Sequence, residues 1–150
     1  MGRRYSIDGE QNIASPDDTC LILTTGGTPN RPEIYDGWLG SEGTPADSAI
    51  VWYLGRSTAA GTSTAVTPQA LDSADPAASA TAGENHTVEP TYTAAAILFR
   101  LGLNQRASHK INFDPQSPIK LPVTANNGVG LYPNHASSTI LVSATLWFLE

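Results

Sequence analysis

The amino-acid sequence predicts an all-β fold, an antiparallel β-sandwich of the jelly-roll kind, formed by one domain over residues 1–150. Charged residues make up only 15% of the chain, although amphipathic helices need many of them on their solvent faces. Short apolar segments follow one another at roughly ten-residue spacing, and turns rich in Pro, Gly and Asn separate them, as in sandwiches and barrels. The last segment alternates with period two, which is typical of a strand.

The first third of the chain contains an expected arm and three candidate strands. Residues 1–18 are predicted to form an extended arm that begins with the basic stretch "MGRRY". The apolar run "TCLILTT" (19–25) predicts a strand, and "RPEIYDGWLG" (31–40) predicts a short and irregular segment. The continuous apolar run "AIVWYLGR" (49–56) is typical of a strand that is buried on both faces.

Residues 57–87 are predicted to form a long surface loop. Ala, Ser and Thr occupy nineteen of these thirty-one positions, and Lys and Arg are absent. Such a segment has too few large apolar side chains to build a core. Inside it, Thr67 followed by Pro68 predicts the start of a short helix, and Asp75–Pro76 predicts the turn after it.

Three further strands are expected before the C-terminal one. "IKLPV" (119–123) is expected at a sheet edge, because Pro122 cannot donate a ladder hydrogen bond. "HKINF" (109–113) predicts a short strand. "TYTAAAILFRLGL" (91–103) predicts a longer one, with one face formed by Ile97, Phe99, Leu101 and Leu103.

The C-terminal segment "STILVSATLWFLE" (138–150) carries the clearest strand pattern. Its second face contains Trp147 and Leu149, two large apolar groups that need cover from a second layer or from another subunit. The alternation divides the strand into one face with Ile140, Val142, Ala144, Leu146 and Phe148 and another with Leu141, Ser143, Thr145, Trp147 and Leu149.

The stretch "TANNGVGLYPNHA" (124–136) resembles a phosphate-binding loop only in its Gly-x-Gly step. A dinucleotide fingerprint needs a third glycine three residues after Gly130, and that position is Pro133. Asn and Gly tolerate positive φ, so residues 126–128 predict a turn and residues 129–132 a short strand.

No spacing in the sequence identifies a catalytic, cofactor-binding or metal-ligating site. His86, His109 and His135 are not spaced as ligand pairs, so surface or hydrogen-bonded histidines are expected. Paired carboxylates for glycoside hydrolysis can come from any part of a fold, and the sequence neither supports nor rejects them. We expect no enzyme activity, no cofactor and no metal.

Tryptophans are candidates for a sugar-binding platform. The sequence contains Trp38, Trp52 and Trp147. Trp52 and Trp147 lie inside strand-like apolar runs, where packing in the core is the favoured interpretation.

Charge and apolar content limit the partners. The net charge of −6 argues against nucleic acid, and the apolar runs are too short to cross a bilayer. Residues 1–89 carry a net charge of −8 and residues 90–150 carry +2, an asymmetry that could orient subunits against one another. Cys20 is the only cysteine, so no internal disulfide forms, and it is expected to be a buried strand residue. No signal peptide is recognisable at the N-terminus.

Several phrases resemble β-sandwich proteins that decorate or cement the heads of tailed bacteriophages. They are "PDDT" (16–19), "STAAGTSTAVTPQALD" (57–72), "LNQRASHKINFDP" (103–115) and "LPVTANNGVGL" (121–131). The resemblance implies a non-enzymatic homotrimer, made in the host cytoplasm, that binds the major capsid protein on the capsid surface of the virion.

Four residues are the expected partner contacts under this interpretation. Arg3, Arg4 and Tyr5 belong to the basic arm, and Trp147 belongs to the apolar outer row of the last strand. Two alternatives stay open. One is another virion component of the tail, neck or fibre, and the other is a carbohydrate-binding or hydrolytic β-sandwich.

Overall fold

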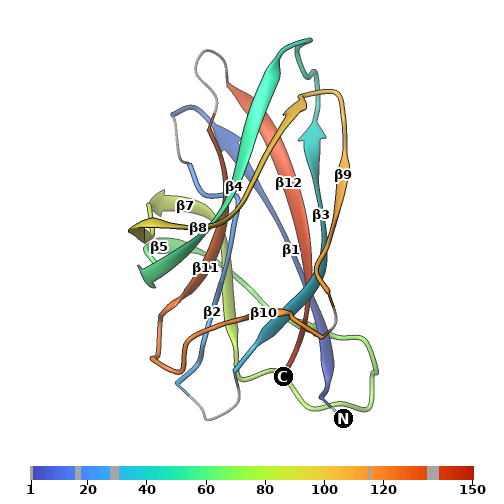
Figure 1. Ribbon diagram of the computed structural model, residues 1–150, viewed down its shortest axis with the longest axis vertical. Helices are drawn as coiled ribbons and strands as arrows, with labels where there is room; N and C mark the ends of the chain where they lie inside the picture. The colour runs from blue at the N-terminus through green and yellow to red at the C-terminus, as the bar shows by residue number, and fades with distance from the viewer. Residues whose placement is uncertain (1, 16–17, 28–30, 115, 135–138) are drawn as a thin grey trace.

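The chain folds into two antiparallel sheets packed face to face, so the predicted antiparallel β-sandwich is confirmed (Figure 1). The computed structural model describes residues 2–15, 18–27, 31–114, 116–134 and 139–150, and none of these residues is helical. Both chain ends lie at the same end of the sandwich (Figure 1). The backbone N–H of Arg3 donates to the carbonyl of Glu150 at 2.9 Å.

Sheet A contains the first and the last strand of the chain. Its order is β10-β3-β12-β1-β6, and β9 also pairs with β3. The strands are β1 (Arg4–Ile13), β3 (Glu33–Glu42), β6 (Gln69–Ala70), β9 (His109–Asn112), β10 (Ile119–Lys120) and β12 (Ile140–Leu149).

Sheet B has the order β5-β7-β2-β11-β4-β8, and its strands come from the remaining segments. They are β2 (Leu21–Thr24), β4 (Ala49–Ala59), β5 (Thr62–Val66), β7 (Thr81–Val88), β8 (Thr91–Asn104) and β11 (Gly128–Asn134). Strand β1 contacts β7, β2 and β5 of sheet B, and the Arg56 guanidinium of β4 donates to the Lys120 carbonyl of β10. Strands β8, β9 and β10 therefore lie along one side of the sandwich, and β1, β6, β5 and β7 lie along the other.

The core lies between the sheets and is built by strand alternation. Strand β12 shows it most clearly, because its burial alternates over all ten residues as the sequence predicts. Trp52 from sheet B and Phe148 from sheet A are fully buried and belong to one continuous cluster. Burial of each large apolar side chain contributes about 1.5–3 kcal/mol.

The prediction of an extended arm over residues 1–18 is wrong for most of its length. Residues 4–13 form β1, which pairs with β12 along all ten positions, from Arg4 opposite Leu149 to Ile13 opposite Ile140. Its inward positions include Tyr5, Ile7 and Ile13, each only 1% exposed. Glycine and glutamine occupy the inward positions between them, which weakens the alternation in the sequence.

The predicted loop over residues 57–87 instead contains three strands, β5, β6 and β7. The burial of β5 and β6 is low, so small residues and threonines suffice there. The helix predicted at Thr67–Pro68 is absent from this described segment, because Gln69–Ala70 pairs with Ser6 and Tyr5 of β1. A turn lies just before the predicted position Asp75–Pro76: the Asp75 N–H donates to the carbonyl of Asp72 at 3.0 Å, so the turn spans residues 72–75.

Two further strands differ from their predictions. The expected short, irregular segment at 31–40 is β3, a full strand between β12 and the β9–β10 edge. Its two glycines at 37 and 40 weakened the pattern. Strand β4 is not buried on both faces along its length: Ile50, Trp52 and Leu54 are fully buried, whereas residues 49, 51 and 53 are exposed or half-buried.

Strand β8 carries a bulge that changes the predicted face. Phe99, Leu101 and Leu103 are half-buried as expected, whereas Ile97 is 47% exposed. The pairing with β4 shifts here, since Leu54 faces Phe99 but Gly55 faces Ile97. Leu98 is the extra residue, and an extra residue reverses the faces that follow it.

The turns around β10 and β11 follow the sequence closely. Strand β10 lies at the edge of sheet A and ends two residues before Pro122, although it is shorter than the predicted 119–123. Asn126 has a positive φ of 63° in the turn before β11. Strand β11 includes the predicted residues 129–132 and is almost entirely buried. His135 lies outside the described residues.

Cys20 is fully buried, as predicted, although it lies directly before β2 and not in the strand. Its Sγ lies 3.5 Å from the carbonyl of Gly9, and burial raises the pKa of the thiol above its ordinary range. We expect no reaction of the folded protein with a thiol reagent at pH 8 and one equivalent of reaction in guanidinium chloride, since the thiolate is the reactive form. Reaction of the native chain at the rate of the denatured one would contradict this burial.

Candidate interaction surfaces

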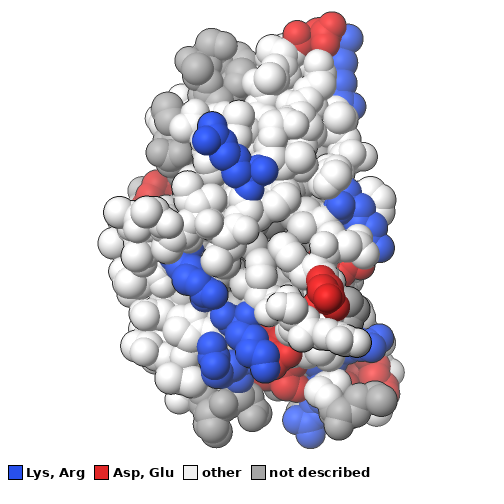
Figure 2. All heavy atoms as spheres, viewed as in Figure 1, with Lys and Arg blue, Asp and Glu red and all other residues white. Residues whose placement is uncertain are grey.

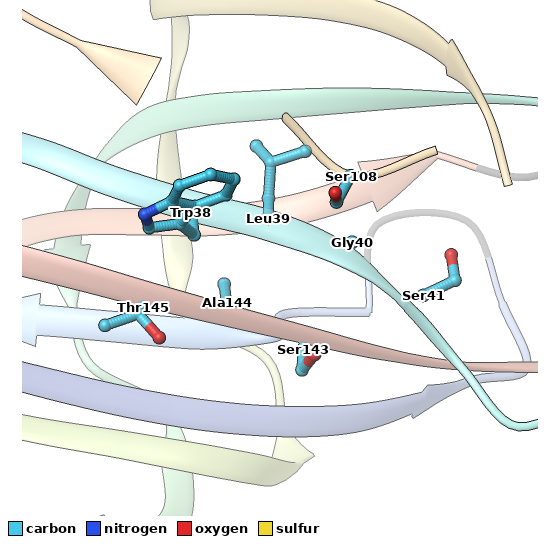
Figure 3. A pocket seen from close by; sticks show the side chains of 8 residues that line it. All are labelled: Trp38, Leu39, Gly40, Ser41, Ser108, Ser143, Ala144 and Thr145. Atoms are coloured by element: carbon cyan, nitrogen blue, oxygen red, sulfur yellow. The ribbon is translucent and has the colours of Figure 1, made fainter. Parts of the chain in front are cut away.

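The outer face of sheet A carries a shallow hollow beside Trp38, here called the Trp38 hollow. Trp38 is opposite Thr145 of β12 on one side and Lys110 of β9 on the other. Its indole is 44% exposed, and the hollow beside it holds about 200 Å³. Figure 3 shows that β3, β12 and the segment before β9 supply its walls, with hydroxyl groups from Ser108, Ser143 and Thr145.

Trp147 lies on the same outer face, where the sequence places it, and is half-buried. Its register partners are Ser6 of β1 and Asp36 of β3. Trp147 is therefore a diagonal neighbour of Trp38, and such neighbours are within reach of one another's aromatic side chains. The Lys110 ammonium lies 3.0 Å from the Asp36 carboxylate beside them. An exposed indole among hydroxyls can stack on a sugar ring or accept an apolar side chain of a partner.

A second hollow, here called the acidic hollow, adjoins the first through the shared lining residues 143–145. It holds about 350 Å³, and its carboxylates come from Asp8, Glu10, Glu42 and Glu84. None of these four forms an ion pair with a described residue. The Glu84 carboxylate accepts a hydrogen bond of 2.8 Å from the Glu10 N–H, so β7 covers part of the open edge of β1.

The third surface is the free edge of β8. This strand pairs with β4 on one side and with no described strand on the other. Ile97 and Leu98 are 47% and 37% exposed there. The Arg100 guanidinium lies 5.4 Å from the centre of the Tyr53 ring, on the outer face of sheet B. The sequence signal for this surface was the run "AAAILF" without a charge, which predicted a strand but not an exposed edge.

The three expected contact residues of the arm each contact another part of the fold, but only Tyr5 is buried. Tyr5 is buried, stacks on Phe148 with ring centres 5.4 Å apart, and donates a hydrogen bond of 3.0 Å to the Pro76 carbonyl. Burial raises its pKa. Its assignment as a partner contact is therefore wrong for this structure. Arg3 and Arg4 are exposed: Arg3 lies 3.7 Å from Asp75, and the Arg4 guanidinium lies 5.7 Å from the centre of the Tyr35 ring.

His86 is buried and hydrogen-bonded, which is one of the two environments expected for the histidines, surface or hydrogen-bonded. Its Nδ1 donates to the Thr19 carbonyl at 3.0 Å, and burial lowers its pKa despite the neighbouring Glu89 carboxylate. His109 is exposed on β9. No group of three or more His, Cys, Asp or Glu side chains in the described ranges is arranged to hold a metal ion.

The lowered pKa of His86 predicts a loss of stability on mild acidification. The unfolded chain binds a proton at this residue more readily than the folded chain, so the free energy of unfolding falls as pH drops below about 6.5. We expect His86→Gln to flatten the dependence of the urea midpoint on pH between pH 7.5 and 5.5, and His109→Gln is the matched control for the removal of a histidine. Equal slopes for both variants would contradict this assignment.

No helix among the described residues is long and apolar enough to cross a membrane. No known protein-family model matches the chain, and no curated protein sequence matches it either.

Proposed function

We propose that this chain is a non-enzymatic structural protein of a bacteriophage virion. Its most specific form is a decoration or cement protein that binds the major capsid protein lattice on the capsid surface as a homotrimer, after synthesis in the host cytoplasm. The observation that supports the proposal is the free β8 edge. The proposals of a virion location, a trimer and a capsid partner rest on the resemblance of the four sequence phrases to head decoration proteins.

An open edge of this kind is unusual in a protein that works alone. Strands average about five or six residues, and proteins protect their edges with charges, prolines, bulges or short strands. Strand β8 has fourteen residues with Arg100 as its single charge. Its register shifts all lie before Phe99, so residues 99–104 form a regular free edge, and the apolar Ile97 and Leu98 beside it are exposed. Such an edge is protected when a neighbouring subunit covers it.

Repeated weak contacts suit a protein that strengthens a shell. When several copies are linked, the second and third contacts with the lattice become intramolecular, and avidity rises by about 10²–10⁴ when the geometry matches. The two sheets are held together by the apolar core between them, so their outer faces and edges provide fixed surfaces for such contacts. The Trp38 hollow on sheet A is then available for the capsid protein.

Antibody labelling of virions tests the proposal. Phage particles from a culture that makes this protein are labelled with an antibody against the purified chain and imaged by negative-stain electron microscopy. We expect label over the head surface. Label confined to the tail or neck would favour the alternative virion component, and unlabelled particles that also lack the chain in mass spectra would overturn the virion role.

A carbohydrate-binding module is the second candidate, and the exposed indole of Trp38 favours it. Under this candidate, the purified chain binds glycans. Trp38→Ala is expected to weaken that binding at least tenfold, because the stacking of a sugar ring on the indole is lost. Val123→Ala, at a position 58% exposed elsewhere on the surface, is the matched control. Absence of glycan-array signal for the unmodified chain would remove this candidate.

A further inference from the structure

The two sides of the sandwich differ in the balance of their charges, although the β8 side also contains the exposed Asp47, whose carboxylate accepts a hydrogen bond from Asn104. On the β8 side, Arg100 and Arg106 are exposed, and neither forms an ion pair within the part of the chain that the structure describes. Lys110 and Lys120 lie on the same side, already paired with Asp36 and Glu33. Figure 2 shows Lys and Arg side chains spread over one face among uncharged residues, with Asp and Glu side chains at several places between them.

The opposite side, formed by β1, β6, β5 and β7, carries unpaired carboxylates. Asp8 and Glu10 are exposed on β1, and Glu84 on β7 is half-buried beside them. The two cations of this side are engaged: Arg3 lies near Asp75, and Arg4 lies over the Tyr35 ring. An excess of negative charge therefore remains on the β1 side.

Each side also offers apolar surface and incomplete strand pairing. Strand β6 pairs with β1 at Tyr5 and Ser6, and beyond them no described strand pairs with this edge of β1, although Glu84 and the N–H of His86 on β7 hydrogen-bond to it. Leu71, directly after β6, is 52% exposed. On the other side, Ile97 and Leu98 project from the free edge of β8.

We propose that copies of this chain associate head to tail, with the β8 side of one copy docked on the β1 side of the next. Charge complementarity favours this contact over a contact between two β8 sides. Two β8 sides facing each other would bring Arg100 and Arg106 of both copies together, whereas the β1 side presents Asp8, Glu10 and Glu84. Complementary charge fixes orientation and rejects the like-charged pairing. A head-to-tail contact uses different patches on the two copies, so it forms a closed ring when the rotation between copies permits.

This inference rests on the self-association in the proposed function and names the surfaces that make it. Two variants separate the surfaces. Leu98→Asp/Arg100→Glu changes only the β8 side, and Asp8→Lys/Glu10→Lys changes only the β1 side. All four side chains lie on the surface, and thermal unfolding checks that both variants fold as the unmodified chain does.

Light scattering after size exclusion measures the mass of each protein and of their mixture. We expect the unmodified chain to be an oligomer, each variant alone to be a monomer, and an equimolar mixture to associate. Association follows because the intact β8 side of the β1-side variant meets the intact β1 side of the β8-side variant, and the reversed charges of the two altered sides are complementary as well.

Every other outcome overturns the head-to-tail contact. A monomeric unmodified chain removes self-association itself. An oligomeric β1-side variant shows that β8 pairs with another β8 or that the contact lies elsewhere, and a mixture that stays monomeric shows that the two sides do not meet. If the antibody labels virions but light scattering finds a monomer, the virion role is kept and the contact between copies is rejected. If light scattering finds the expected oligomers but virions are unlabelled, the contact is kept and the virion role is rejected.

Discussion

A chain that lacks residues 1–10 is expected not to fold. The deletion removes most of β1, which lies between β12 and β6 in sheet A. Tyr5 and Ile7 leave the core with it, and both are 1% exposed in the intact protein. The N–H and C=O groups of β12 that pair with Arg4 to Glu10 lose their partners.

The magnitudes support complete unfolding. Burial of the two lost side chains is worth about 3–6 kcal/mol together, and each hydrogen bond lost from the ladder adds about 0.5–1.5 kcal/mol. A domain of ordinary stability has only about 5–15 kcal/mol in total. The shortened chain therefore falls below the threshold for a folded state.

Circular dichroism and chemical unfolding measure this effect directly. The full-length variant Arg3→Ala/Arg4→Ala is the matched control, because it removes the basic charge but keeps the strand. Exposed ion pairs such as that between Arg3 and Asp75 contribute about 0–1 kcal/mol, so this control should unfold close to the unmodified chain. A cooperative unfolding transition of the shortened chain would show that the first ten residues are an arm after all.

The N-terminal strand also shows where sequence reasoning reached its limit. Strand β12 was predictable because all five of its inward positions are apolar, whereas its outward positions include Ser143 and Thr145. In β1 the inward positions 9 and 11 are Gly and Gln, so the alternation is interrupted. Its place in the sheet depends on pairing with β12, more than 120 residues away, and local pattern carries no such information.

The candidate surfaces were predictable only in part. Trp147 was expected on the outer face of the last strand, and the structure places it there. The exposure of Trp38 was not evident, because the glycines around it hid strand β3. The free edge of β8 depends on strand order, and its bulge at Leu98 depends on the pairing with β4. Neither property is encoded in a short segment.

Glycine 128 illustrates a local residue choice with a long-range cause. In the sequence it completes the turn signal "NNG", where glycine is expected for a positive φ. In the structure the positive φ belongs to Asn126, and Gly128 instead begins β11 between Thr24 of β2 and Ser57 of β4. A Cβ at this position would overlap the Leu23 carbonyl oxygen and lie 2.8 Å from the Thr24 Cα.

The substitution Gly128→Ala is therefore expected to destabilise the protein strongly. Both obstructing atoms belong to the backbone of β2, so no rotamer change can relieve the overlap, and the two central strands must separate. Overpacking of this kind costs about 1–3 kcal/mol and sometimes more, which for a domain of this size lowers Tm by roughly 2–4 °C per kcal/mol.

Gly102→Ala is the matched control for this substitution, since it makes the same chemical change on β8, where a Cβ would meet nothing within 4 Å. There, the smaller conformational freedom of the unfolded alanine chain is expected to leave stability unchanged or to raise it by up to about 1 kcal/mol. Calorimetry of both variants measures the difference. Because β2 and β11 lie so close together, we expect Gly128→Ala to lower Tm and Gly102→Ala not to lower it. Equal Tm shifts for the two variants would show that β11 can move away from β2 without a loss of stability.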